Sequence, residues 1–105
     1  MATPRPPYTA VIFTSVRTDA ETQQYAATSD RMEELAAQQP GYLGIESARD
    51  SGGQGITVSY WATEADAIAW KRVAEHQDAQ RRGREAWYAA YTVRIATVHR
   101  DYGTT

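Results

Sequence analysis

The 105-residue sequence contains no cysteine. This absence excludes disulfide bonds, thiolate metal sites and a cysteine nucleophile, and it fits a reducing compartment. No apolar run is long enough to cross a membrane, and the first residues, MATPRPPY, lack the apolar stretch of a signal peptide. We therefore expect a cytoplasmic protein that begins with a flexible tail over residues 1–7.

An excess of charge of one sign is also lacking. The net charge is −2, and acidic and basic residues are interspersed. No strong field therefore favours nucleic acid or an anionic membrane as a partner. The run RRGRE over residues 81–85 precedes aromatic residues, as in some nucleic-acid binders, but the acids Asp78 and Glu85 favour an ordinary surface helix. We expect a small molecule or another protein as the partner.

Motifs of metal and nucleophile chemistry are missing as well. The two histidines, His76 and His99, are far apart, and no HExxH or GxSxG pattern occurs. We therefore predict no metal site. His99 lies near the end of a predicted strand, where we expect it on the surface.

Four segments have the residue types and alternation of β-strands, namely Tyr8–Arg17, Tyr42–Arg49, Ile56–Trp61 and Tyr91–Arg100. The first has apolar residues in both alternating sets, which indicates a central strand. The glycine-rich segment DSGGQG over residues 50–55 lacks the lysine and the context of a phosphate-binding loop. It is typical of a hairpin connection between the second and third strands.

Helical patterns occupy the remaining segments. Thr18 and Glu21 have the spacing of a capping box and predict a helix that ends near Gln39, before Pro40-Gly41. Its apolar stripe consists of Tyr25, Thr28, Met32, Leu35 and Ala36.

Two further helices are predicted before the last strand. Thr63 and Asp66 indicate the start of one that runs from Glu64 to about Gln77. A short helix over residues 78–89 is expected next, and its Trp87 and Tyr88 would pack it onto the sheet.

This element order predicts an α+β, ferredoxin-like βαββαβ domain over residues 8–100, followed by a C-terminal tail over residues 101–105. Helices on one face of a four-stranded antiparallel sheet leave the other face uncovered. Because several strands are apolar on both sides, we expect a homodimer in which sheet faces sheet.

Several segments together resemble the antibiotic biosynthesis monooxygenase (ABM) family. They are VIFTSVRT, PGYLGIES, ITVSYW and the stretch that begins AWKRVAEHQ and ends TVRIATVHR. The resemblance extends from Tyr8 to Arg100, and it implies a dimeric α+β barrel. The family includes cofactor-independent oxygenases of polycyclic phenols, haem-degrading enzymes, isomerases and members without known activity.

The resemblance to haem-degrading members implies an asparagine on the first strand, a tryptophan on the second main helix and a haem-ligating histidine beyond it. Trp70 matches the tryptophan. The first strand offers Phe13 or Thr14 instead, the sequence has no asparagine, and the histidine position is Gln80. Haem is therefore disfavoured, and we predict no bound cofactor.

The resemblance to cofactor-free members implies oxidation of a small aromatic or phenolic substrate by O2. We predict a pocket between helices and sheet that contains Phe13, Tyr60, Trp70 and His76. Trp70 would be its wall and His76 its proton-transfer group, because imidazole titrates near neutral pH. Six residues along an unbroken helix turn a side chain by about 240°, so these two would share the cavity only if the helix breaks between them.

Two arginines complete the predicted site. Arg17 or Arg94 would stabilise an anionic substrate oxygen. Two alternatives to a cofactor-free monooxygenase stay open. One is a haem-binding or haem-degrading monooxygenase, and the other is a non-catalytic dimeric barrel protein that binds a small ligand. The same tryptophan and histidine could equally be a core residue and a solvated surface residue.

Overall fold

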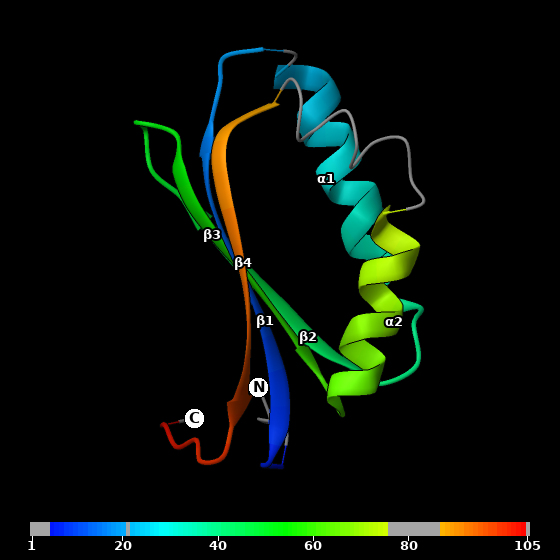
Figure 1. Cartoon of the computed structure of the whole chain (residues 1–105). Helices are drawn as coiled ribbons and strands as arrows, with labels where there is room; N and C mark the ends of the chain where they lie inside the picture. The colour runs from blue at the N-terminus through cyan, green and yellow to red at the C-terminus, as the bar shows by residue number, and fades with distance from the viewer. Residues whose placement is uncertain (1–4, 21, 76–86, 105) are drawn as a thin grey trace.

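The computed structural model describes residues 5–20, 22–75 and 87–104. Its elements are β1 (Tyr8–Arg17), α1 (Thr22–Ala37), β2 (Tyr42–Arg49), β3 (Gln54–Trp61), α2 (Glu64–Glu75) and β4 (Tyr88–Val98). The four strands form one antiparallel sheet in the order β2-β3-β1-β4. Both helices lie on one face of this sheet (Figure 1). The ferredoxin-like α+β fold and the central place of β1 are confirmed.

The strand register decides which side chains share a face. Val11 of β1 lies opposite Ser59 of β3 and Ile95 of β4, and all three face the helices. Ile12, one residue along, lies opposite Val58 and Arg94 on the uncovered face.

The core forms where the two helices meet the sheet. Trp61 is 0% exposed, and the small side chains of Ala36 and Ala67 let α1 and α2 approach its ring. The indole Nε1 donates a hydrogen bond of 2.9 Å to the Ser59 hydroxyl, so this buried polar atom has a partner.

Local sequence signals explain several element boundaries. The amide of Asp66 donates to the Thr63 hydroxyl over 3.1 Å, and that hydroxyl donates to the Asp66 carboxylate over 2.9 Å, which confirms the predicted start of α2. Gly41, with φ of 82°, forms the turn between α1 and β2. The turn between β2 and β3 confirms the predicted hairpin, although β3 begins at Gln54.

Several predicted boundaries differ, among them those of the last strand, predicted over Tyr91–Arg100 and observed over Tyr88–Val98. The first helix extends over Thr22–Ala37, and the Thr18 hydroxyl before it accepts a hydrogen bond from the amide of Ala20. Glu21 lies outside the described residues. The predicted helix over residues 78–89 is wrong at its end, since Tyr88 and Ala89 belong to β4 and Tyr88 pairs with Arg17 of β1. The basic run over residues 81–85 also lies outside the described residues.

The two ends of the domain lie close together at one end of the sheet (Figure 1). Tyr8 at the start of β1 donates its hydroxyl to Asp101 over 2.7 Å, which ties the residues after β4 to the first strand. No helix in the described part of the chain has the length and apolar character needed to cross a membrane.

Candidate functional site

A cavity of about 500 Å³ lies between the sheet and the two helices. Its sheet side consists of Val11, Phe13, Ile45, Thr57, Ser59, Tyr91, Val93 and Ile95, and its helix side includes Tyr25, Met32, Ala67 and Trp70. Most of these side chains are apolar or aromatic. A volume in this range suits a small organic ligand.

Trp70 of α2 lies in the wall of this cavity. Its ring stacks on that of Trp61, with centroids 5.9 Å apart and planes inclined by 20°. Trp61 in turn meets the edge of Tyr42, with centroids 5.8 Å apart. The buried partner fixes the orientation of Trp70, so the cavity has one rigid, flat wall.

Phe13 of β1 lies on the sheet side of the same cavity. Its ring stacks on Tyr91, with centroids 5.6 Å apart, and meets Tyr88 edge-on at 5.2 Å. Phe13 and Trp70 therefore lie in one cavity, as the sequence predicts.

Tyr25 and Tyr88 line one end of the cavity, beside the start of β4. Their rings meet edge-on, with centroids 6.0 Å apart. Nη2 of Arg49 donates to the Tyr25 hydroxyl over 3.3 Å and to the Ser15 hydroxyl over 2.8 Å. A phenol pair with a guanidinium group behind it thus closes this end of the cavity, whose lining also includes Glu33 and Lys71.

Burial is the main cause that raises the pKa of Tyr88, and its hydrogen bond with Tyr25 raises that pKa further. The positive charges of Arg49 and Arg17 lower the pKa of Tyr88, but they do not outweigh burial. Tyr88 therefore keeps its proton at neutral pH and acts as a hydrogen-bond donor.

Arg17 lies behind this end and does not line the cavity. Its guanidinium carbon lies 3.9 Å from the centre of the Tyr25 ring, and Nη1 donates to the carbonyl of Trp87 over 3.0 Å. This residue holds the tyrosine ring and the start of β4 in place.

The prediction that Tyr60 lies in the helix-side pocket is wrong. Tyr60 points to the uncovered face, where its hydroxyl donates to Glu46 over 3.1 Å and its ring meets Tyr8 edge-on at 5.7 Å. Burial and this hydrogen bond raise the pKa of Tyr60. Arg94, opposite Ile12, is on the same face and is also outside the cavity. Both corrections follow from the alternation of side chains along a strand.

His76 lies outside the described residues, so its predicted place in the pocket stays a prediction. The helix before it is continuous from Glu64 to Glu75. His99 is exposed beyond the end of β4, as expected. No group of three or more His, Asp or Glu side chains within the described ranges could hold a metal ion.

The end formed by Tyr25, Arg49 and Tyr88 was missed by sequence reasoning. In the sequence Tyr25 is one member of an apolar helix stripe, and Tyr88 resembles a helical residue. Near the start of β4, Val16 pairs with Ala90 but Arg17 pairs with Tyr88, so Ala89 is an extra residue. This bulge lets Tyr88 and Tyr91 both face the cavity, three positions apart. No local sequence signal marks it.

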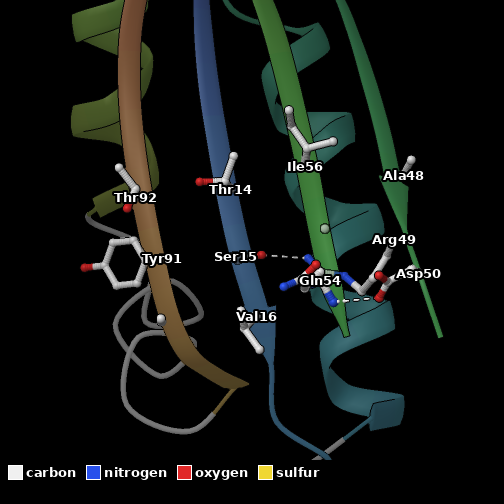
Figure 2. Close-up of a pocket in the computed structure, with 12 residues that line it drawn as sticks. Thr14, Ser15, Val16, Ala48, Arg49, Asp50, Gln54, Ile56, Tyr91 and Thr92 are labelled. Atoms are coloured by element: carbon white, nitrogen blue, oxygen red, sulfur yellow. Dashed lines mark hydrogen bonds between the residues drawn. The ribbon is translucent and has the colours of Figure 1, made fainter. Parts of the chain in front are cut away.

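A second, shallow hollow lies at the same end of the sheet (Figure 2). Residues of all four strands line it, among them Thr14, Ala48, Gln54, Ile56 and Thr92. Figure 2 shows Arg49 reaching from β2 across β3 toward Ser15 of β1. Arg49 therefore lines this open hollow while its guanidinium donates to the Tyr25 hydroxyl at the end of the cavity under the helices.

The fold and cavity together define a single-domain α+β protein with an aromatic-lined pocket under its helices. Residues 7–82 match the model of the family described as antibiotic biosynthesis monooxygenase. The chain belongs to this ABM family. It is 51% identical over 99 residues to the uncharacterized protein YqjZ of Bacillus subtilis, a match that covers 94% of this chain and 86% of the relative.

Solved structures of low sequence identity share the fold. SnoaB of Streptomyces nogalater, described as a cofactor-independent oxygenase, superposes with a TM-score of 0.75 at 10% identity, covering 90% of this chain and 95% of SnoaB. A protein of Nitrosomonas europaea that carries the same family name superposes with a TM-score of 0.70 at 15% identity, covering 84% of this chain and 95% of that one. These structural similarities show that the fold is shared. The chemistry depends on the residues of the site.

Proposed function

We propose that this protein is an ABM-type monooxygenase that oxidises a small aromatic, phenolic substrate with O2 and without a bound cofactor. The observation that carries the proposal is the aromatic cavity of about 500 Å³, with the flat face of Trp70 in its wall. The structural likeness to SnoaB, described as a cofactor-independent oxygenase, supports the same reaction class.

The reaction has a simple balance. A ring methylene next to a phenol loses two hydrogens and gains one oxygen atom from O2, so that CH2 becomes C=O and the second oxygen atom leaves as water. The substrate supplies the electrons once it is deprotonated. The protein has to bind the ring, exclude water and stabilise the developing oxyanion.

Trp70 and Phe13 would hold the substrate ring, since both line the cavity and are fixed by aromatic contacts. His76 remains the predicted proton-transfer residue, because imidazole is suited to this task near neutral pH. Arg17 would contribute positive charge from behind Tyr25, at a distance from the substrate itself.

We also propose that the protein is a homodimer that joins the uncovered faces of two sheets. That face carries Ile12, Ile56 and Val58, and no helix in the described ranges covers it. Burying apolar side chains of this kind is the usual driving force for association.

Oxygen uptake with a panel of anthrones and hydroquinones tests the proposed activity. We expect oxygen uptake by the wild-type protein and a large loss of uptake in Trp70→Phe and His76→Ala. His99→Ala, which removes the exposed histidine, is the matched control and should keep the wild-type uptake. Binding of panel members without uptake would favour the non-catalytic dimer. A Soret shift on adding haemin that is lost in His76→Ala would favour the haem enzyme.

A further inference from the structure

Tyr25 and Tyr88 both line one end of the cavity, and their rings are in edge-on contact. Each phenol has one O–H proton to donate. The Tyr25 oxygen accepts a hydrogen bond from Nη2 of Arg49 over 3.3 Å, and Arg49 takes no proton from either phenol. At least one phenolic proton can therefore be donated to a ligand in the cavity.

The charge behind this pair favours an anion. The guanidinium of Arg49 donates to three neutral oxygens, which are the Gly53 carbonyl at 2.6 Å and the hydroxyls of Ser15 and Tyr25. None of these partners cancels its positive charge. Arg17 adds a second cation over the Tyr25 ring. A positive charge behind a phenol strengthens the hydrogen bond that the phenol donates to an anionic oxygen.

The cavity wall also contains apolar and aromatic residues, beside the polar Thr28, Ser29, Glu33 and Lys71. Phe13, Val93 and Ile95 on the sheet side are apolar, and Trp70 presents a flat aromatic wall. A flat ring therefore suits the middle of the cavity, with one oxygen directed toward the tyrosine pair.

We propose that Tyr25 and Tyr88, polarised by Arg49, anchor an acidic hydroxyl or phenolate oxygen of the aromatic ligand. This inference rests on the proposed function and assigns two residues to the phenolic oxygen of its substrate. Tyr25 and Tyr88 are ligand-binding residues in this scheme, and Arg49 is a positioning residue that acts through Tyr25.

A matched pair of flat ligands tests the anchor without turnover. 2-Hydroxyanthraquinone carries an acidic hydroxyl, and 2-methoxyanthraquinone replaces it with an ether of similar shape. Both are already oxidised at the ring carbons, so equilibrium dialysis measures binding alone. We expect the wild-type protein to bind the hydroxy compound about tenfold more tightly than the ether, as one hydrogen bond to a charged oxygen implies.

The variants Tyr25→Phe and Tyr88→Phe keep the rings and remove one hydroxyl each. We expect each to lower the tenfold preference to about twofold or less, while the affinity for the ether stays within about twofold. Tyr60→Phe is the matched control, because it removes a hydrogen-bonded hydroxyl on the opposite sheet face and should keep the preference. Arg49→Gln should lower the preference while both tyrosines remain.

The outcomes separate this inference from the proposed function. Equal binding of the two ligands by the wild-type protein, or an undiminished preference in both Tyr25→Phe and Tyr88→Phe, would overturn the anchor and leave the aromatic cavity in place. If neither ligand binds, the cavity does not take flat aromatic compounds and both proposals fail. The ether reports whether each variant still folds, so a lost preference with retained ether binding identifies the hydroxyl itself.

Discussion

The guanidinium group of Arg49 lies directly over Gly55, in space that a Cβ atom at that position would occupy. An added Cβ would come within 2.7 Å of both terminal nitrogens of Arg49. The arginine can cross from β2 over β3 to the Ser15 hydroxyl on β1 only because this residue has no side chain (Figure 2). Gly55 thus places the cation behind Tyr25.

We expect Gly55→Ala to displace the Arg49 guanidinium and to lower the free energy of unfolding by about 1–2 kcal/mol, through loss of its hydrogen bonds. Urea denaturation measures this change. Gly52→Ala is the control, since its nearest atom would be Asp50 Oδ1 at 3.5 Å, an ordinary contact. In an Arg49→Ala background the cost of Gly55→Ala should nearly vanish. An unchanged cost there would show that the arginine is not the obstacle.

The two stacked tryptophans should respond differently to the same substitution. Trp61→Phe should cost about 2–4 kcal/mol, because it opens space in the core and leaves the buried Ser59 hydroxyl without its donor. Trp70→Phe should cost about 1 kcal/mol or less, since one side of its ring lies against the cavity. Chemical denaturation of both variants checks this order, and a larger loss for Trp70→Phe would contradict the assignment of Trp61 as the core residue.

Tyr8 should make stability depend on pH in the alkaline range. Its hydrogen bond to Asp101, and then burial, raise the pKa of Tyr8 from 10.0 to about 12. Because the folded-state pKa is above the unfolded one, this stabilisation is complete below pH 10 and is lost as the pH rises toward about 12.

Comparison with Tyr8→Phe isolates that contribution. We expect the variant to be less stable than the wild-type protein at a pH of about 9, with the difference shrinking at a pH of about 11.5. Tyr102→Phe removes a hydroxyl from a residue that is 92% exposed, so it should match the wild-type protein at both pH values. A gap between Tyr8→Phe and the wild-type protein that grows with pH would refute the assignment.

The proposed dimer predicts a contrast between two isoleucines of similar exposure. Ile56 on the uncovered sheet face is 42% exposed, and Ile68 on α2 is 39% exposed. Light scattering at micromolar concentration should give twice the chain mass for the wild-type protein and for Ile68→Glu. Ile56→Glu should give the chain mass, because a carboxylate buried between two sheets lacks a partner. A monomeric wild-type protein would rule out the dimer directly.

Local patterns predicted much of the fold. The bounds of β1 and β2 agree with the alternation of their side chains, and the pair Thr63 and Asp66 indicated where α2 begins. Such features depend on residues a few positions apart, so the sequence contains the information needed to predict them. The start of α1 lies at Thr22 and not directly after Thr18, because the chain first makes a turn in which the Thr18 hydroxyl accepts a hydrogen bond from the amide of Ala20.

The candidate site could be predicted only in part, because its members come from distant segments. Trp70 and Phe13 were expected in one pocket and lie there, whereas Tyr60 was assigned to the wrong face of β3. Alternation shows which residues of one strand share a face, but it does not show which face the helices cover. Which face of the sheet is covered depends on how both helices pack against it.

The order of strands and helices and the apolar character of both faces of the central strand follow from residue type and spacing, so they can be predicted from the sequence. The meeting of Tyr25, Arg49 and Tyr88 at one end of a cavity follows from the packing of distant segments. Their meeting depends on a bulge at Ala89 and on the space above Gly55. Both are relations between strands far apart in the chain, and no single segment encodes them.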